Sequence, residues 1–261
     1  MKRRDFLTTG SAGLVAMATT TAFAADEPAT QGFIEVRKYT VENADKRAGL
    51  VTVLDKALIP ALNRQGIKPV GVLIPAPSET EFANNVFVVF PHKTMESFVN
   101  VSAKLLADAE YMKDAAPIFK TTSKDPVYTD CETCLLQGFP TMPTVEVPAL
   151  GPNRVFQLRH YRSFNIERNA AKIRMFDVGG ELPLFREVKM NPIFFGDVIA
   201  GTLMPALLYM IGFPSMEAQA EAWRTFGAHP KWREIRGLPE YADTATKIVN
   251  VLLNPSPGSQ I

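Results

Sequence analysis

The chain contains an internal repeat that extends over most of its length. The stretch Phe33-Ile-Glu-Val-Arg-Lys-Tyr-Thr40 recurs as Val155-Phe-Gln-Leu-Arg-His-Tyr-Arg162, with the same alternation of apolar and polar residues. Further matches fall at nearly the same separation: Pro60 with Pro183, Lys68-Pro69 with Asn191-Pro192, Met95-Glu96 with Met216-Glu217, and 108–111 with 228–232. Several matches in one register indicate that one structural unit occurs twice in the chain. This repeat constrains the fold more than any other feature of the sequence.

Both copies contain periodic segments in the same order. Alternating residues predict strands, and apolar residues that recur every three or four positions predict helices. The order strand, helix, strand, strand, helix, strand follows in 32–139 and again in 154–261. Thr94 and Ser215 stand where helix N-caps are expected. Four prolines mark 140–153 as an extended linker between the two copies.

This order of elements is that of a ferredoxin-like βαββαβ unit, an antiparallel sheet with helices on one face. The bare face of each sheet needs burial, and the two bare faces can supply it to each other. The sequence therefore predicts an α+β protein in which two fused ferredoxin-like units pack sheet to sheet as a dimeric α+β barrel within one chain.

The first residues, 1–24, have the pattern of a secretion signal. Arg3-Arg4 and the following Phe6-Leu7 precede a mildly apolar stretch, which ends in the small-residue cleavage motif Ala22-Phe23-Ala24. The arginine pair favours a bacterial twin-arginine (Tat) signal, and an ordinary Sec signal is the alternative. We therefore expect the protein to be periplasmic or otherwise exported.

Charge excludes some classes of partner. The whole chain carries a net charge of +1, and cleavage after Ala24 removes three basic and one acidic side chain, which leaves the mature protein close to neutral. A nucleic-acid-binding protein usually shows a basic excess, so no nucleic-acid partner is expected. No segment after Ala24 is long and apolar enough to span a bilayer.

The second copy, 154–261, resembles the NIPSNAP family, whose domains belong to the dimeric α+β barrel superfamily. The resemblance rests on these motifs: Gln157-Leu-Arg-x-Tyr161, Met175-Phe176, Gly179-Gly-Glu181, Phe185-Arg186, Asn191-Pro-x-Phe-Phe-Gly196, Pro205-x-Leu-x-Tyr-Met210, Ala222-Trp223-x-x-Phe226, Pro230-x-Trp232 and Pro255-x-Pro-x-Ser-Gln260. The first copy matches only at Glu35-x-Arg-x-Tyr39 and Asp108-x-x-Tyr111. It lacks the Gly-Gly-Glu and Phe-Phe-Gly pieces, so its pocket is expected to differ.

The family resemblance implies the fold and leaves the activity open. The first hypothesis is that the protein binds a small molecule or a protein partner, without a cofactor, and it includes self-association into a homo-oligomer. A second hypothesis is a cofactor-independent oxygenase-like or isomerase-like enzyme that uses the barrel cavity. A third is a haem-binding barrel, in which His160 or His92 would be the single proximal ligand.

Three polar residues alternate on each repeated strand: Glu35, Arg37 and Tyr39 in the first copy, and Gln157, Arg159 and Tyr161 in the second. Their apolar neighbours Ile34, Val36, Phe156 and Leu158 point the opposite way and are expected to face the helices. The polar sets would then line the barrel interior. Converging Arg and Tyr side chains can hold a carboxylate. The competing interpretation is that they pair with one another as a structural polar core.

The other candidate residues fit more than one role. Glu181 follows two glycines and could act as a base near Arg159, or it could cap the helix of 181–187. His160 is expected on the helix side of its strand, and His92 is expected to be exposed. The histidines and the Cys131-x-x-Cys134 pair lack the spacing of a zinc site, so no metal is expected.

Overall fold

The structure is a computed structural model that describes residues 31–261, so the predicted signal in 1–24 lies outside the described residues. The elements of the first half are β1 (Phe33–Thr40), α1 (Ala44–Val53), the π-helical turn η1 (Leu54–Leu58), α2 (Ile59–Arg64), β2 (Gly71–Pro75), η2 (Thr80–Phe82), β3 (Asn85–His92), α3 (Met95–Ala107), α4 (Ala109–Asp114), α5 (Ala116–Phe119) and β4 (Asp130–Gly138). Those of the second half are β5 (Val155–Arg162), α6 (Ile166–Asp177), α7 (Glu181–Glu187), β6 (Asn191–Ala200), β7 (Ala206–Phe213), α8 (Met216–Ala228), α9 (Pro230–Gly237), η3 (Pro239–Tyr241) and β8 (Lys247–Pro255).

Side-chain caps fix the start of the main helices at matching places in the two halves. Asn43 and Asn165 accept a hydrogen bond from the backbone N–H three residues later, at the starts of α1 and α6. Thr94 and Ser215 do the same for α3 and α8. The two caps predicted from the sequence are confirmed. Each satisfies an N–H group that the helix itself leaves without an acceptor.

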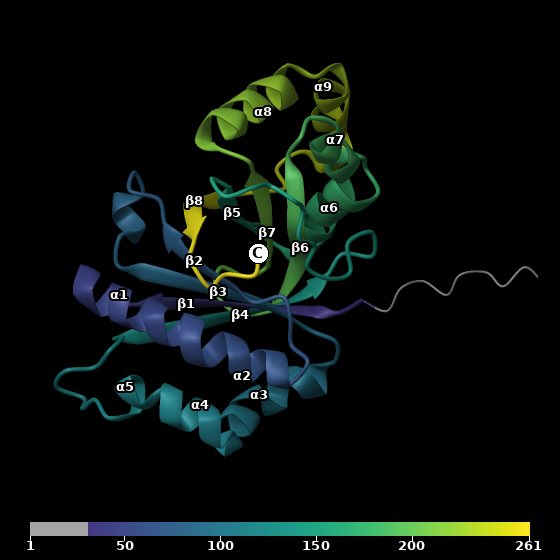
Figure 1. The fold of residues 1–261 in the computed structure, drawn as a ribbon. Coiled ribbons are helices and arrows are strands. Elements are labelled where there is room, and N and C mark those ends of the chain that lie inside the picture. The colour runs from purple at the N-terminus through teal and green to yellow at the C-terminus, as the bar shows by residue number, and fades with distance from the viewer. Residues whose placement is uncertain (1–30) are drawn as a thin grey trace, which may run out of the picture.

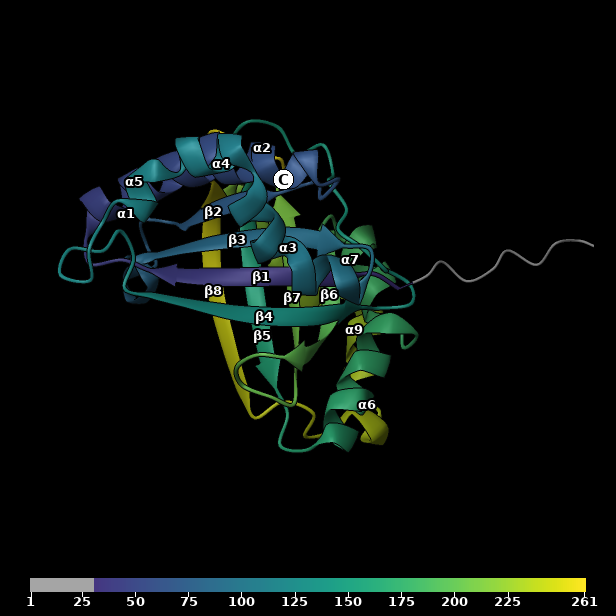
Figure 2. The same ribbon diagram turned by 90° about the horizontal axis from the view of Figure 1, so that it is seen from below.

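The eight strands form one closed antiparallel barrel in the order β1-β3-β2-β8-β5-β7-β6-β4. Each half contributes four neighbouring strands, and the strands of one half run across those of the other (Figures 1 and 2). Two seams join the halves, where β2 pairs with β8 and β4 pairs with β6. The predicted α+β barrel is confirmed. Closure removes the unpaired strand edges that an isolated four-stranded sheet would present.

The barrel interior is an apolar core that contains residues of both halves. Ile34, Val36, Phe156 and Leu158 all belong to this core, together with side chains of the other strands. Our expectation that these four residues face the helices, and that the polar sets line the interior, was therefore wrong. The alternation shows which residues share a face, but both faces of each strand are covered here, so alternation alone cannot say which face is inside.

Helices cover the outer face of each half of the barrel. In Figure 1, α1 to α5 lie against the first half and α6 to α9 against the second. Each layer buries its own apolar core, centred on Leu62 and Phe90 in the first half and on Phe176 and Phe185 in the second. The polar set of β1 that ends in Tyr39 points into the first layer, and the set of β5 that ends in Tyr161 points into the second, so the two sets lie on separate sides of the barrel.

The segment 140–153 and the last residue help to close the barrel interior. Val145, Leu150 and Ile261 pack into the interior core. The backbone N–H of Glu146 donates to the carbonyl of Ile193 in β6, which holds the segment against the strand.

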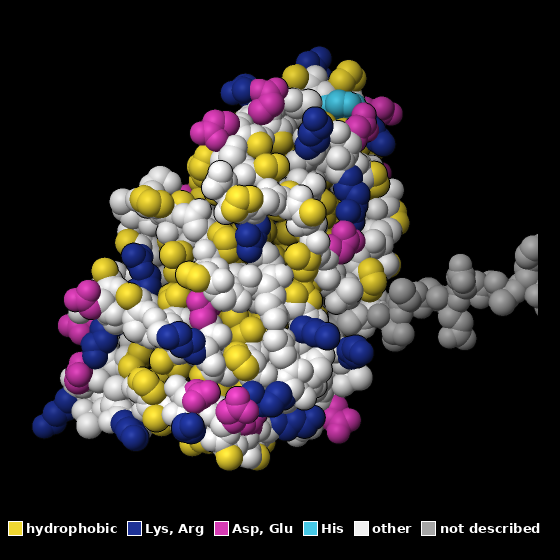
Figure 3. All heavy atoms as spheres, viewed as in Figure 1, with side chains coloured by type: hydrophobic (Ala, Val, Ile, Leu, Met, Phe, Trp, Pro, Cys, Tyr) yellow, Lys and Arg dark blue, Asp and Glu magenta, His cyan; other side chains and the backbone are white. Residues whose placement is uncertain are grey.

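The helices and the charged side chains of the described residues have two plain features. None of the helices within 31–261 is both long and apolar enough to cross a bilayer. On the face seen in Figure 3, basic and acidic side chains are interspersed.

Barrel closure predicts the behaviour of the isolated second half. A fragment of 154–261 would expose Phe156, Leu158 and Phe194, which are buried in the intact chain, and would leave the edges of β6 and β8 unpaired. We expect this fragment to self-associate, as exposed apolar faces and open edges do. Light scattering after size-exclusion chromatography measures this. A stable, monodisperse monomer would contradict the importance of the interior core.

Candidate functional site

A cavity of about 540 Å³ opens between β5 and the helices of the second half. Three of the sequence-predicted site residues line it, namely Arg159, Tyr161 and Glu181. The remaining wall includes Lys172 of α6 and the aromatic side chains Trp223, Phe226 and Trp232. We call this cavity the Arg159 pocket. Its volume lies within the range of about 300–1,000 Å³ that is usual for small-molecule sites.

Arg159 is held in the pocket by aromatic residues. Its Nη2 and Nε donate to the hydroxyl of Tyr161 at 2.8 and 3.1 Å. Its guanidinium carbon lies 4.7 Å from the centroid of the Trp223 ring. Among residues 31–261, no carboxylate forms an ion pair with Arg159, although Glu181 lines the same pocket. The guanidinium therefore keeps both a charge and free N–H donors for an anion.

The orientation of Trp223 is fixed by Gln157, the first residue of the polar set on β5. The Gln157 side-chain oxygen accepts from Trp223 Nε1 at 2.5 Å and from Gln219 at 3.3 Å. Its amide nitrogen donates to Asn250 of β8 at 2.6 Å. A neutral Gln at this position thus shapes the pocket without neutralising Arg159.

A buried ion pair forms the floor of the pocket. Lys172 Nζ lies 3.2 Å from Glu181 Oε2, and only 8% and 4% of the two side chains are exposed. The ammonium also lies 4.4 Å from the centroid of the Phe176 ring. Burial raises the pKa of Glu181, and the charge and hydrogen bond of Lys172 oppose that rise. Glu181 stands in the first turn of α7, but the N-cap is Gly180 and no side chain caps this helix, so the predicted capping role was wrong. The carboxylate pairs with Lys172 and lines the same pocket as Arg159.

Sequence reasoning missed Lys172. The available signal was a lysine on the apolar stripe of α6, three and four residues before Met175 and Phe176. A charged residue on such a stripe needs a buried partner, and the nearby Glu181 supplies it.

Tyr161 lines the pocket, and Tyr209 lies behind it in the core. The hydroxyl groups of Tyr161 and Tyr209 lie 3.3 Å apart. Tyr209 is fully buried and stacks on Phe195 with ring centroids 4.5 Å apart. Burial raises the pKa of Tyr209 well above 10, so this phenol stays neutral and keeps its proton.

Arg37 and Tyr39 do not share this pocket. They lie on the helix side of the first half, where Arg37 Nε donates to Glu35 Oε1 at 2.5 Å. Tyr39 packs edge-on against Tyr128, with centroids 5.1 Å apart. The expectation that both polar sets converge on one cavity was wrong, because the sheet of each half separates its own set from the other.

The histidines differ from their expected positions. His92, expected to be exposed, is buried, and both of its ring nitrogens are hydrogen-bonded. His160, expected on the helix side, faces the barrel interior, where its Nε2 has no partner among the described residues. The interior cavity beside it measures about 290 Å³.

Neither histidine fits the haem hypothesis. His92 has no free nitrogen for iron. The cavity at His160 lies just below the range of about 300–1,000 Å³ that holds drug-sized ligands, and haem is larger than these. Among the residues that the structure describes, no cluster of three His, Cys, Asp or Glu side chains could hold a metal ion. Cys131 and Cys134 are free thiols there, one exposed and one buried.

Comparison with known proteins supports the fold and leaves the activity open. No protein-family profile and no curated protein sequence matches the chain. A candidate monooxygenase from Lactobacillus acidophilus superposes with a TM-score of 0.58 at 10% identity, over 86% of this chain and 94% of its own. A second candidate monooxygenase, from Fusobacterium nucleatum, gives a TM-score of 0.57 at 10% identity, over 86% and 92%. At such low identity the similarity establishes an α+β barrel fold of this type.

Solved NIPSNAP structures are also similar, over a smaller part of the chain. A NIPSNAP-like domain protein from Burkholderia xenovorans matches 40% of this chain and 87% of its own, at 17% identity and a TM-score of 0.37. A TM-score this low does not by itself establish a shared fold. The NIPSNAP resemblance therefore rests on the motifs of the second half.

The buried ion pair predicts a non-additive effect on stability. Glu181→Leu leaves the Lys172 ammonium buried without its partner and should lower the free energy of unfolding by about 3 kcal/mol. Adding Lys172→Met removes that charge and should recover most of the loss. Urea denaturation of the single and double variants measures this.

The exposed pair of Arg186 and Glu146 is the matched control, since about half of each side chain meets solvent. Glu146→Leu should change the unfolding free energy by no more than about 1 kcal/mol. An equal loss at both pairs, or no recovery in the double variant, would show that the Lys172–Glu181 contact is energetically unimportant.

The buried His160 predicts a pH dependence of stability. Burial lowers its pKa from 6.5 to about 4, so the folded protein binds this proton more weakly than the unfolded chain does. The contribution of the neutral His160 side chain to the free energy of unfolding is therefore fully present above pH 6.5, and it is lost as the pH falls toward 4. Wild type should lose about 3 kcal/mol more than His160→Leu over this interval. Denaturation at both pH values measures the difference, and parallel curves would contradict it.

Proposed function

We propose that this chain is an exported protein of the NIPSNAP type, built from two fused related units, that binds a small anionic molecule in the Arg159 pocket. The arginine pair and the cleavage motif within 1–24 support export to the periplasm by the twin-arginine route. The motifs in 154–261 support the family. The equal order of elements in the two halves supports the fusion.

The single observation that carries the binding proposal is the state of Arg159. A partly buried guanidinium usually has a carboxylate partner, because the loss of water around the charge is costly. Arg37, at the same place in the first half, has such a partner in Glu35. Arg159 has a tyrosine hydroxyl and a tryptophan face instead. An anionic ligand would supply the missing charge.

The walls of the pocket favour a planar, aromatic anion. Trp223, Phe226 and Trp232 offer flat apolar surfaces, and the guanidinium fork matches a carboxylate. Lys172 is already neutralised by Glu181, and the other carboxylate at the pocket, that of Asp243, is exposed at the rim. The ligand class is therefore a small aromatic carboxylate. A protein partner is less well supported, since the pocket has the size of a small-molecule site.

The two tryptophans allow a direct test. They are the only tryptophans in the sequence, and both line the pocket, so tryptophan fluorescence reports on this site alone. We expect 4-nitrobenzoate to quench the fluorescence saturably, and its neutral analogue 4-nitrobenzamide to bind at least about tenfold more weakly. The reason is that a hydrogen bond to a charged group contributes about 1.5–3 kcal/mol.

Variants separate binding from folding. Arg159→Ala should weaken 4-nitrobenzoate binding at least about tenfold with little change in melting temperature, since no ion pair is broken. Arg162→Ala, an exposed change on the same strand, should bind like wild type. Equal affinity for acid and amide, or full affinity in Arg159→Ala, would contradict the proposal. Loss of binding and folding together would make Arg159 a structural residue.

A second candidate is a cofactor-independent enzyme that removes a proton from the molecule it binds. The raised pKa of Glu181 makes its carboxylate a stronger base than a surface glutamate. In deuterated water, such a site would take a methylene proton from 4-nitrophenylacetate onto Glu181 and return a deuteron. Exchange seen by NMR in wild type and absent in Glu181→Gln would favour this candidate over simple binding.

A further inference from the structure

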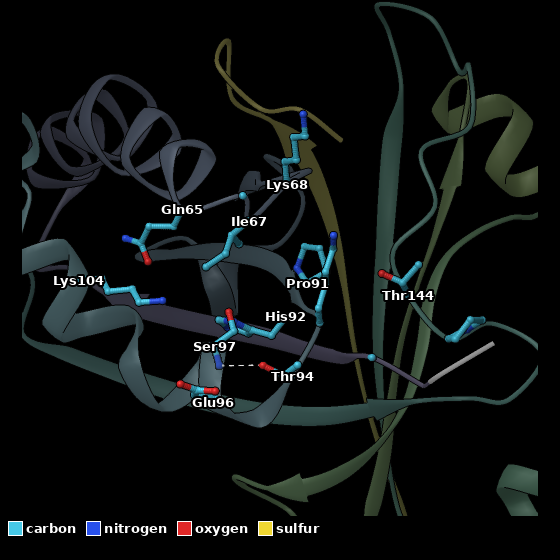
Figure 4. A pocket seen from close by; sticks show the side chains of 14 residues that line it. Gln65, Ile67, Lys68, Pro91, His92, Thr94, Glu96, Ser97, Lys104 and Thr144 are labelled. Atoms are coloured by element: carbon cyan, nitrogen blue, oxygen red, sulfur yellow. Dashed lines mark hydrogen bonds between the residues drawn. The ribbon is translucent and has the colours of Figure 1, made fainter. Parts of the chain in front are cut away.

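A second and larger cavity, of about 750 Å³, lies on the first half of the molecule. It is bounded by the turn after α2, the end of β3, the start of α3 and the segment around Thr144 (Figure 4). His92 and Ser97 both line it. We call it the His92 cleft. It shares no lining residue with the Arg159 pocket.

A chain of hydrogen bonds leads from this cleft into the protein. Ser97 Oγ lies 2.9 Å from His92 Nδ1, and His92 Nε2 lies 2.9 Å from Glu35 Oε2. The other carboxylate oxygen of Glu35 accepts from Arg37. The His92 and Glu35 side chains are only 0% and 2% exposed. Ser97 is half-buried, so the chain runs from the cleft inward.

The protonation of this chain follows from Glu35. Burial by itself would raise the pKa of Glu35, but the hydrogen bond from His92 and the charge of Arg37 hold that pKa below its usual value. An ionised carboxylate only accepts hydrogen bonds, so His92 Nε2 must carry the ring proton. In the neutral imidazole Nδ1 then offers its lone pair, and the hydroxyl of Ser97 donates to it. The imidazole is thus positioned to take the serine proton.

We propose that Ser97, His92 and Glu35 form a catalytic triad for hydrolysis of small anionic esters. Nucleophile, base and orienting carboxylate are within hydrogen-bond reach in the order that activates a serine. In the serine proteases the serine is hydrogen-bonded to Nε2 and the carboxylate to Nδ1. Here Ser97 is hydrogen-bonded to Nδ1 and Glu35 to Nε2. Arg37 acts as a positioning residue, because it holds Glu35 ionised and oriented.

The surroundings of Ser97 suit a negatively charged substrate. Lys68, Lys93 and Lys104 line the cleft, and Glu96 is the one acidic residue in its wall. In Figure 4, Lys104 extends from α3 toward Ser97. Ser97 itself is fixed by its backbone N–H, which donates to Thr94 Oγ1 at 3.2 Å. The N–H group of Glu96, which lines the cleft in the first turn of α3, has no helical acceptor and can bind a developing oxyanion.

The reaction balances without a cofactor. Ser97 Oγ attacks the ester carbonyl carbon, and its proton moves to His92 Nδ1. The C–O bond to the alcohol then breaks, and the alcohol leaves with that proton. Water attacks the acyl-serine, gives a proton to Nδ1 and releases the acid, and the proton returns to Ser97 Oγ.

A covalent probe tests the nucleophile directly. Diisopropyl fluorophosphate should form one serine adduct, with loss of HF, and peptide mass spectrometry should place it on Ser97. Ser97→Ala should not be labelled. Ser102→Ala, an exposed serine on the same helix, should be labelled like wild type. Melting temperatures confirm that both variants fold. Absence of an adduct on Ser97 in wild type would overturn the proposal and leave the serine as a partner that merely satisfies His92.

Turnover tests the substrate class. Wild type should hydrolyse 4-nitrophenyl hemisuccinate faster than the neutral 4-nitrophenyl acetate, and Ser97→Ala should reduce the hemisuccinate rate at least about 100-fold. Ser102→Ala should leave this rate unchanged. The measurement is ester hydrolysis in the His92 cleft and not binding in the Arg159 pocket, so the two proposals can fail independently. Hydrolysis that persists in Ser97→Ala, with acylated lysine in the peptide map, would count against the triad.

Discussion

The pairing of β2 with β8 and of β4 with β6 is the constraint on which the rest of the structure depends. These two seams bring the inner faces of both half-sheets together and bury one shared apolar core. Burial of apolar area of this kind is the main favourable term in folding. Because the inner faces are apolar, Arg37 of β1 and Arg159 of β5 lie on the outward faces, under the helices. Both candidate sites follow from that arrangement.

The corresponding positions of β1 and β5 are used in different ways. In the first half, Glu35 neutralises Arg37 and leaves its second oxygen for His92. In the second half, Gln157 stands at the place of Glu35 and holds Trp223 instead. The amide at this position leaves Arg159 without a carboxylate partner and holds Trp223 beside it. The two halves therefore place different chemistry on one scaffold.

Much of the fold could be predicted from local patterns, and the sites only in part. The caps at Thr94 and Ser215 and the order of elements depend on neighbouring residues, which a single sequence shows. Arg159, Tyr161 and Glu181 were found because the repeat and the glycine pair mark them. Lys172, Ser97 and the burial of His92 were missed. Their roles come from contacts between residues on different elements, for which the sequence offers no periodic signal.

The sequence by itself determined that the chain would form two similar α+β halves, and which residues would share a face of each strand. Periodicity and capping are local properties, so these conclusions needed no tertiary information. Only the tertiary structure decided which face turned inward, because both faces of β1 and β5 are covered by other parts of the protein. It also decided that Arg37 and Arg159 would lie on separate sides of the barrel. Which face of each strand turns inward depends on the total apolar area that barrel closure buries, and this area is a property of all eight strands together.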